Sequence, residues 1–436
     1  MSTAPSLQIR LPELGRDADI VVALSGGLDS TVLLHALAAM PEARAHGLRV
    51  VHVHHGLSTS ADAWVTDCQR LCASLELPLR VLQVQVDRRS KLGLEGAARE
   101  ARHAALEAQL RPGDLLALAH HRDDQAETFL LRALRASGPD GLAAMRVLRP
   151  FAQGFLWRPL LDVARADLLS YAQAHGLAWV EDPANASLEH DRNFLRHRVL
   201  PLLRERWPHA DAAFARAAAL NADAADLLRE DDRLALDAAR MEATDLLSTD
   251  ALRTLSAPRR ARVLRAWVAS LDLPPLPAEG IAQIEADLDF PAPDSDFAFA
   301  WSGAELRRWR GRLRAARASA RAPAADWTDT WDGRAPLILP DGGTLELLGT
   351  PAFDAPLQVR LRAGGERIVL PGRTHSHSLK HALQDAAIPP WERERLPLLC
   401  DREGTVLAAG DRVLASPLEA WLRARDAKLR WTPPSH

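Results

Sequence analysis

The chain has 436 residues, of which 47% are hydrophobic and 25% are charged, and its formal net charge at pH 7 is −3. This composition is typical of a folded chain and excludes an intrinsically disordered one, and the length predicts two or three domains. Because the net charge is slightly negative, any nucleic acid that the chain binds must be held by local basic patches.

The sequence carries no sign of export or membrane insertion. No apolar run approaches the length of a membrane span, and the first residues lack a basic segment followed by an apolar one. The cysteines are sparse and odd in number, as is typical of reduced thiols: Cys68, Cys72 and Cys400. We therefore expect a cytoplasmic protein with no membrane partner.

The first half of the chain alternates apolar runs of strand length with stretches of helical spacing. The strand candidates are 18–24, 48–55, 79–86 and 114–120, and the helix candidates are 30–40, 62–75 and 94–110. Such alternation predicts parallel strands joined by right-handed crossovers, with ligands bound at the carboxyl ends of the strands. We expect a Rossmann-like α/β catalytic domain with a parallel sheet over residues 1–207.

The rest of the chain predicts two smaller domains. An alanine-rich helical texture begins near residue 208 and predicts a mostly helical domain over 208–325. Within it, residues 296–317 fit either a hairpin or a basic helix, and both stay open. The alanine- and proline-rich segment 316–329 is the linker candidate. A small α+β domain is expected over 326–436, with strand candidates at 337–348, 357–363 and 366–370 and a helix candidate at 378–387.

The segment Ser25–Ser30 reads SGGLDS and stands between the first predicted strand and a helix. Gly26 and Gly27 let the backbone approach a ligand, and the unpaired N–H groups of a helix start attract phosphate. No Gly-Lys-Ser/Thr follows, which excludes a loop that holds a γ-phosphate with a lysine. A carboxylate such as Asp29 repels phosphate unless it serves a metal or a substrate group. On its own the segment describes an ordinary capped turn equally well.

A second group of polar residues lies on the helix predicted after the fourth strand. His120, Asp124 and Glu127 follow one another at i, i+4 and i+7 and so share a helix face that suits an amine or a metal. The alternative is a solvated helix start, in which Asp123 and Asp124 simply favour the helix dipole.

A third group, Glu95, Arg99 and Arg102, has the same spacing on an earlier predicted helix. Its alternative interpretation is an ordinary exposed ion pair between glutamate and arginine. Spacing alone does not decide between a functional and a structural role for either helix.

The Ser25–Ser30 segment is similar to the loop of the pyrophosphate-loop ATPases, which cleave ATP between the α and β phosphates. Together with segments 94–102, 119–138, 181–203 and 361–399, it resembles the tRNA(Ile)-lysidine synthase family. The matching residues beyond the loop are Glu95, Ala98, Arg99, Glu100, His120, Asp124, Gln125, Glu127, Asp182, Asn185, Arg192, Asn193, Arg196, Pro201, Gly364, Gly365, Glu366, Lys380, Pro389, Trp391, Arg393 and Pro397.

The resemblance implies a ligase that forms a carbon–nitrogen bond. ATP adenylates the C2 oxygen of the wobble cytidine in the isoleucine tRNA with a CAU anticodon. The amine of free L-lysine then displaces AMP to give lysidine. The loop residues implied to bind ATP are Ser25, Gly26, Gly27, Leu28, Asp29 and Ser30. Mg²⁺ is expected to share the charge of the leaving pyrophosphate through Asp29.

The resemblance also assigns roles to residues outside the loop. Arg99 is expected to neutralise the α-phosphate, and Asp124 and Glu127 to bind the ammonium groups of lysine. The residues implied to contact tRNA are Arg192, Asn193 and Arg196 near the active site, and Lys380 and Arg393 in the C-terminal domain. The chain departs from the family at Ser58, where an arginine is usual, which puts in doubt a phosphate contact there.

Several questions stay open at this point. The base that deprotonates the attacking amine is His55, His120 or His121. A homodimer is open as well. Alternative functions are a tRNA thiolase of the same superfamily, an ammonia-using amidating ligase, and a tRNA-binding protein without activity. The first is disfavoured because no cysteine pair with CxxC spacing is present.

Overall fold

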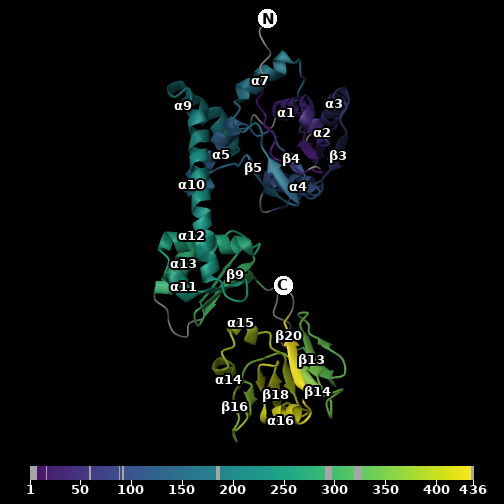
Figure 1. Cartoon of the computed structure of the whole chain (residues 1–436), viewed down its shortest axis with the longest axis vertical. Coiled ribbons are helices and arrows are strands. Elements are labelled where there is room, and N and C mark those ends of the chain that lie inside the picture. The colour runs from purple at the N-terminus through teal and green to yellow at the C-terminus, as the bar shows by residue number, and fades with distance from the viewer. Residues whose placement is uncertain are drawn as a thin grey trace. The chain divides into compact units, whose positions relative to one another are not determined.

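The computed structural model describes residues 7–15, 17–57, 60–87, 89–90, 93–182, 187–289, 297–318 and 327–433. They belong to two compact units, Met1–Arg229 and Glu230–His436 (Figure 1). Throughout these described ranges, no helix is long and apolar enough to cross a membrane.

A six-stranded sheet forms the centre of the first unit, in the order β3-β2-β1-β4-β6-β5. Its strands are β1 (Ile20–Ala23), β2 (Arg49–His54), β3 (Leu79–Gln83), β4 (Leu115–Ala117), β5 (Leu148–Phe151) and β6 (Gly154–Trp157). All neighbouring pairs are parallel except β5 with β6. The four strands expected from the apolar runs are thus confirmed as β1 to β4. Because the strand order reverses at β1, a topological switch point lies between β1 and β4, where α/β sheets bind ligands.

Helices cover both faces of this sheet. Those up to residue 174 are α1 (Leu28–Ala38), α2 (Pro41–Ala45), α3 (Ala61–Ser74), α4 (Gly93–Glu107), α5 (Arg122–Leu134), α6 (Pro139–Leu142) and α7 (Arg165–Ala174). Val22 of β1 packs in one core with α1, α3 and α7, whereas its neighbour Val21 packs in another with Leu106 of α4. A strand buried on both faces must be apolar at every position, which is why β1 appears in the sequence as an unbroken apolar run.

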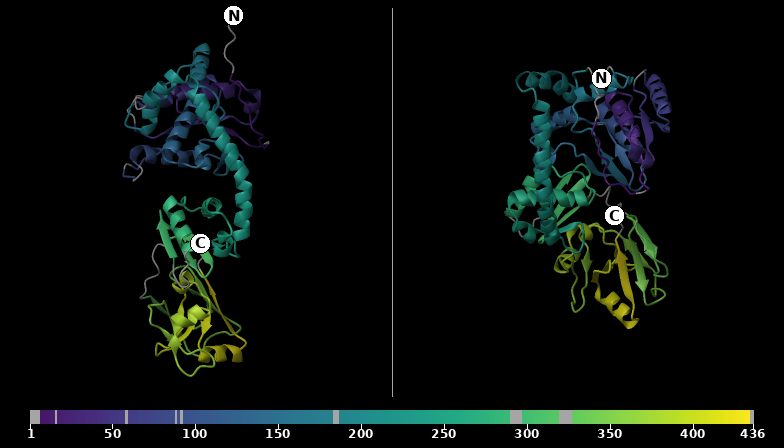
Figure 2. Two further views of the ribbon diagram at one scale, coloured as in Figure 1. Left: turned by 90° about the vertical axis from the view of Figure 1, so that its left-hand side faces the viewer. Right: turned by 45° about the horizontal axis from the view of Figure 1, so that its top comes forward.

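The first unit ends in a series of helices. They are α8 (Asp191–Phe194), the π-helical segment η2 (Leu195–Val199), α9 (Leu200–Arg206) and α10 (Ala210–Ala239). Figure 2 shows α10 as one unbroken helix, which continues into the second unit. The helical texture that begins near residue 208 in the sequence is this element.

The next elements combine helices with an antiparallel sheet of order β7-β10-β9-β8. They are β7 (Leu246–Ser248), α11 (Thr249–Arg253), α12 (Ala257–Ser270), α13 (Ala278–Asp289), β8 (Phe297–Trp301), β9 (Ala304–Trp309) and β10 (Arg312–Arg317). The open alternative at 296–317 is therefore resolved as strands over its described residues. The connecting pairs Ser302-Gly303 and Arg310-Gly311 all have positive φ, which is the requirement of tight hairpin turns.

The C-terminal part is an α+β arrangement with sheets of seven and three strands around one apolar core. Its strands are β11 (Thr328–Trp331), β12 (Leu337–Ile338), β13 (Thr344–Leu348), β14 (Leu357–Arg360), β15 (Arg367–Ile368), β16 (His377–Ser378), β17 (Leu398–Cys400), β18 (Val406–Ala409), β19 (Val413–Leu414) and β20 (Lys428–Thr432). Its helices are α14 (Leu379–Asp385), α15 (Pro390–Arg393) and α16 (Ser416–Ala424). The expected strands and helix are all present. Most of the linker candidate, 319–326, lies outside the described residues.

A buried carboxylate holds the amino ends of three strands together. Asp114 is fully buried. It accepts hydrogen bonds from the amides of Asp19 and Arg111, at 3.0 Å each, and forms an ion pair with Arg49. We expect Asp114→Ala to lower the free energy of unfolding by about 2–4 kcal/mol, because two amides lose their acceptor and the partly buried Arg49 keeps only Asp19 as a carboxylate partner. The measurement is urea unfolding followed by circular dichroism.

The matched control is Asp67→Ala, which breaks an exposed ion pair with Arg70 on α3. It should change the same free energy by no more than about 0.5 kcal/mol. Equal effects of the two substitutions would contradict the role given to Asp114.

Candidate active site

The glycine turn after β1 is held in shape by its own serines. Gly26 has a φ of +87°, and a Cβ added to it would lie 3.2 Å from the sulfur of Cys68. The Ser30 hydroxyl accepts from the amide of Ser25 at 3.1 Å and donates to the carbonyl of Gly27 at 3.1 Å. The turn is therefore preformed, and a side chain at Gly26 would strain it.

The same turn opens helix α1, and Gly27 is its N-cap residue. Thr31 donates its amide to the Gly27 carbonyl at 3.0 Å. By helix geometry the amides of Leu28, Asp29 and Ser30 precede the first intrahelical donor, so they face the open end of the helix. The side chain of Leu28 is buried, which leaves its backbone for a ligand. Such a ring of amides at a switch point is a phosphate-binding site.

His121 is a buried cation between three carboxylates. Its ring lies within 3.6 Å of oxygens of Asp29, Asp123 and Asp124. Burial alone would lower the pKa of His121, but hydrogen bonds and charges from these carboxylates outweigh it and raise the pKa to about 10. The Asp124 amide donates to Nδ1 at 3.4 Å, a long hydrogen bond that belongs to the cap of α5. With a pKa of about 10, His121 is protonated at neutral pH and links the glycine turn to α5.

The adjacent His120 is the opposite case. Its Nδ1 accepts a hydrogen bond from Nε of Arg158 at 3.2 Å. Burial lowers the pKa of His120 to about 3, and the positive charge of Arg158 acts in the same direction, although Asp124 opposes them. His120 is thus neutral, with its free lone pair already used by Arg158.

His55, just beyond β2, is also neutral at pH 7 but not engaged in this way. Burial lowers its pKa below the ordinary 6.5, and the charge of Arg102 adds to the effect. Its Nδ1 is buried and has no hydrogen-bond partner within the described ranges. Of the three candidate bases, His55 is therefore the neutral histidine with an unused ring nitrogen.

The carboxylate pair on α5 lies where the helix spacing predicted, but it is covered by arginines. Asp124 is 8% exposed and Glu127 is fully buried. Arg192 donates from Nε to Glu127 at 2.7 Å, and Arg196 donates to Glu127 at 2.6 Å and to Asp124 at 2.9 Å. The structure thus brings the expected lysine-binding and tRNA-binding residues into one ion-paired cluster. Asn193, between them, donates to the carbonyl of Ser187.

Other residues singled out from the sequence lie apart from this cluster or outside the description. Arg99 is on the exposed side of α4, and the side chain of Glu95 is not described, so their ion pair is not tested. Ser58 and Asn185 also lie outside the described residues.

In the second unit, the two residues expected to contact tRNA differ in their exposure to solvent. Lys380 is exposed on α14. Arg393 is 7% exposed, donates from Nε to the carbonyl of Ile388, and lies 5.2 Å from the ring centre of Trp309. The guanidinium of Arg393 is thus turned into the protein and does not face solvent. It stabilises the packing of α15.

The structure adds Arg149 and Arg158, which the sequence analysis missed. Arg158 follows β6 directly and is 7% exposed. The available signal was the end of an apolar strand, the position at which α/β enzymes place functional groups. The strand candidates in the sequence did not include β5 and β6, so their ends were not considered as positions of functional groups.

The carboxylate of Asp29 offers a partial site for a metal ion. Its Oδ1 is buried and has no hydrogen-bond partner among the described residues. The described ranges contain no group of three or more histidine, cysteine, aspartate or glutamate side chains arranged as metal ligands. Mg²⁺ is commonly held by one or two carboxylates together with substrate phosphates. Asp29 therefore fits Mg²⁺ only with a nucleotide that supplies further oxygens.

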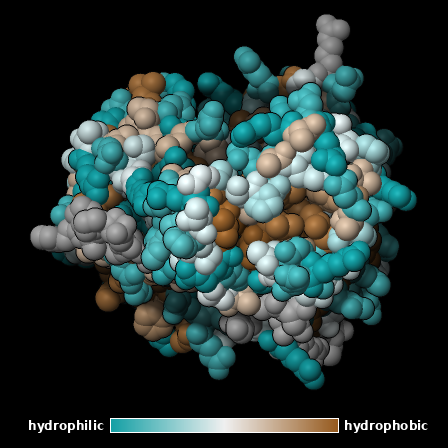
Figure 3. Space-filling view, turned by 90° about the horizontal axis from the view of Figure 1, so that it is seen from below, coloured by the Kyte–Doolittle hydropathy of each residue, from teal (hydrophilic) through white to brown (hydrophobic). Residues whose placement is uncertain are grey.

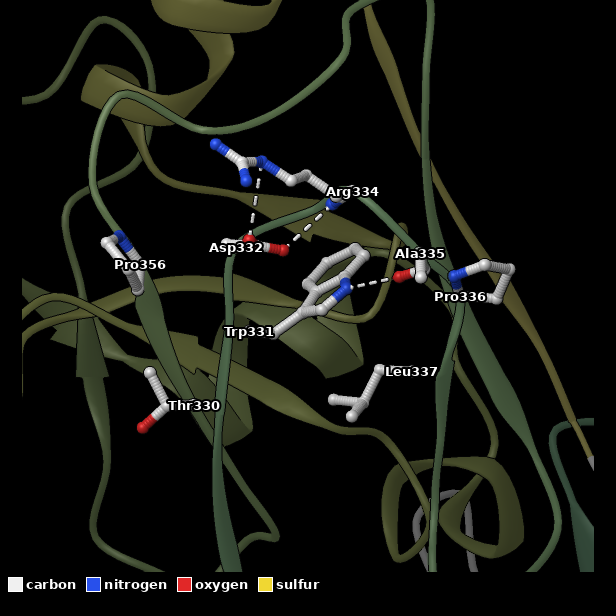
Figure 4. Close-up of a pocket in the computed structure, with 8 residues that line it drawn as sticks. All are labelled: Thr330, Trp331, Asp332, Arg334, Ala335, Pro336, Leu337 and Pro356. Carbon is white, nitrogen blue, oxygen red and sulfur yellow. Dashed lines mark hydrogen bonds and ion pairs between the residues drawn. The ribbon is translucent and has the colours of Figure 1, made fainter.

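A hollow in the C-terminal part lacks this chemistry. It lies around Trp331, whose indole donates to the carbonyl of Ala335 at 2.7 Å, beside the ion pair of Asp332 and Arg334 (Figure 4). Its polar groups are thus engaged with one another, and it contains no residue expected to act on a substrate. Figure 3 shows one face of the molecule, on which hydrophilic side chains surround a hydrophobic hollow.

Comparisons with known proteins agree with the fold. The PP-loop domain family matches residues 5–203, the TilS substrate binding domain matches 247–314, and the TilS substrate C-terminal domain matches 357–431. The tRNA(Ile)-lysidine synthase of Xanthomonas axonopodis pv. citri is 58% identical over 414 residues, 94% of this chain and 93% of that one. The same enzyme of Xylella fastidiosa is 54% identical over 427 residues, 97% and 96% of the two chains.

Solved structures are more distant. A U34-tRNA thiolase from Methanococcus maripaludis is 18% identical, with a TM-score of 0.38 over 47% of this chain and 72% of that one, which is too low to support an argument about function. The similarity to these two relatives spans nearly the whole chain. The three domain families match three successive regions of it. From its sequence similarity, the chain belongs to the tRNA(Ile)-lysidine synthase family.

Proposed function

We propose that this chain synthesises lysidine in the cytoplasm. ATP adenylates the C2 oxygen of the wobble cytidine in the isoleucine tRNA with a CAU anticodon, and the amine of L-lysine displaces AMP. The observation that carries this proposal is the connection of a preformed phosphate-binding turn to a buried carboxylate pair through one protonated residue, His121. Of the three substrates of this reaction, ATP and lysine need these two features at one site.

In this proposal the turn Ser25–Ser30 holds the phosphates of ATP. Its amides stabilise the negative charge of the departing pyrophosphate, and Arg99 neutralises the α-phosphate. Mg²⁺, held by Asp29 and by phosphate oxygens, supplies further positive charge there. The products are AMP and pyrophosphate rather than ADP.

Asp124 and Glu127 bind the ammonium groups of lysine in this proposal. Buried carboxylates need a cationic partner, and Arg192 and Arg196 fill that role in the structure. Lysine binding therefore requires these arginines to give up some of their hydrogen bonds. The released guanidinium groups are then available to RNA phosphates, as expected of Arg192, Asn193 and Arg196 as tRNA contacts.

His55 is the base that we assign to the attacking amine. It is neutral at pH 7, its Nδ1 has no partner within the described ranges, and it lies just beyond the carboxyl end of β2. His121 is already protonated, and His120 has its lone pair engaged by Arg158. Neither of these two can accept a proton as readily.

The alternative functions fit the structure less well. Cys68 and Cys72 are buried on α3, and burial raises the pKa of Cys68 to about 12 and that of Cys72 to about 11. Thiols with such pKa values are poor nucleophiles, which argues against a thiolase. An ammonia-using ligase has no need of the two domain types that follow residue 207. A homodimer stays a prediction, which light scattering of the purified chain would test.

The first prediction concerns the glycine turn. Gly26→Ala should raise the KM for ATP by about tenfold or more, because the new methyl group meets Cys68 and φ is +87°. The control Gly113→Ala has nearly the same φ, +86°, with open space around the new Cβ. It should cost about 1 kcal/mol of stability and leave the KM for ATP unchanged. Similar KM values for both variants would argue against ATP at this turn.

The second prediction concerns the lysine site. Asp124→Asn should abolish incorporation of labelled lysine into the tRNA while RNA binding is nearly retained, because the amine loses a counter-charge while Glu127 still pairs with Arg192 and Arg196. Filter binding and label incorporation measure the two properties. Asp226→Asn, on α10, removes an exposed ion-pair partner of Arg146 and should change neither. Loss of RNA binding alone in the Asp124 variant would count against the assigned role.

The third prediction concerns pH. A base must be unprotonated to act, and because the pKa of His55 is lowered, the acid limb of the rate profile should lie below pH 6.5. His55→Gln should slow lysine incorporation by about 100-fold or more at pH 7 and remove that limb. His209→Gln, at an exposed position, is the control. An unchanged limb in His55→Gln would exclude His55 as the base.

A further inference from the structure

A group of arginines without carboxylate partners lies at the edge of the sheet in the first unit. Arg149 on β5 pairs in register with Leu156, so it stands beside the carboxyl end of β6, and Arg158 follows that strand directly. Throughout the described ranges, neither Arg149 nor Arg158 forms an ion pair with an aspartate or glutamate. Other partly buried arginines of the chain, such as Arg204 and Arg260, do form such pairs.

The hydrogen bonds of these two arginines go to neutral groups. Arg158 donates to the ring of His120 at 3.2 Å and to the carbonyl of Arg146 at 2.9 Å. Arg149 donates to the carbonyl of Pro150 at 3.2 Å. Two partly buried guanidinium groups therefore keep their full positive charge without an anion to offset it.

These charges act on one another. Burial lowers the pKa of Arg158 to about 10, and the charges of Arg149, Arg99 and Arg132 act in the same direction. Burial and Arg99 likewise lower the pKa of Arg149. Like charges held together in a partly buried place are unfavourable, and an anion bound among them would remove that cost.

A partly buried aromatic side chain, Phe151, adjoins the arginines and also packs against the apolar core that contains Leu106. The guanidinium carbon of Arg149 lies 5.4 Å from the ring centre of Phe151, on the same strand and the same face. The ring of His103 on α4 meets Phe151 edge-on, with centres 6.0 Å apart. Cationic groups next to aromatic rings are the combination with which proteins bind single-stranded nucleic acid, since the cations contact phosphates and the rings stack on bases.

We propose that Arg149, Arg158 and Phe151 form a binding site for a phosphodiester group and an adjoining base of the single-stranded RNA that flanks the target cytidine. This inference rests on the proposed function, because it assumes an RNA substrate at the neighbouring site. The pyrophosphate part of ATP is assigned to the turn after β1, and β5 lies three strand positions away, about 14 Å at the usual spacing. The hydrogen bond from Arg158 to His120 connects this site to the segment that leads into α5.

The test uses the full chain and an RNA stem-loop that carries the anticodon. Arg149→Gln should weaken binding of this RNA about tenfold, and the dependence of log K on log salt should become shallower by about 0.7, the value for one contact to a single-stranded phosphate. Arg149→Lys, which keeps the charge, should retain most of that salt dependence. Phe151→Leu should lower affinity about fivefold without changing the salt dependence, because a stacked base carries no charge. The control is Arg70→Gln, an exposed arginine on α3 of the same unit.

Steady-state rates complete the test. The KM for tRNA should rise in Arg149→Gln while the KM values for ATP and lysine stay at their original values. A salt dependence equal to that of the unmodified chain would overturn the proposal. So would a raised KM for ATP with unchanged RNA binding, because the anion would then be a phosphate of the nucleotide. Failure of the unmodified chain to incorporate lysine would instead refute the proposed function, and the direct RNA measurement would still decide this site.

Discussion

The pairing of buried charges around the start of α5 is the constraint on which the rest of the active site depends. Asp124 and Glu127 are removed from water, and buried carboxylates are tolerated only when cations and hydrogen bonds replace the lost hydration. His121 supplies one cation from the end of β4, and Arg192 and Arg196 supply two more from a segment about seventy residues later. The glycine turn, the carboxylate pair and the later helices are therefore fixed to one another through a single set of ion pairs.

Much of the first unit could be predicted from local patterns. Strands buried on both faces have to be apolar throughout, so β1 and β4 were visible as unbroken apolar runs, and parallel strands then placed their carboxyl ends together. The segment 297–317 was harder, because alternating arginine and tryptophan side chains fit a basic helix as well as a sheet. The positive φ values at Ser302 and Arg310 form the turns between the strands, and neither serine nor arginine usually adopts this backbone conformation.

Side-chain partners were the part of the site that could not be predicted. Helix spacing placed Asp124 and Glu127 on one face correctly, but nothing in it shows that arginines from α8 and η2 close over them. The protonation states of His120 and His121 could not be predicted from the sequence either. These two neighbours in the sequence meet opposite surroundings, an arginine for one and three carboxylates for the other, because consecutive residues at a strand end point in different directions.

The sulfur behind the nucleotide turn has a consequence for the chemistry that this turn can withstand. Cys68 is 1% exposed and lies against Gly26, and burial raises the pKa of its thiol to about 12, so the thiol form prevails at pH 7. Peroxides and disulfides react with the thiolate form, so this residue is protected from them by both its ionisation and its burial. The glycine turn is thus backed by a group that fills space as a small apolar side chain does, and its shape should persist under oxidising conditions that would modify an exposed cysteine.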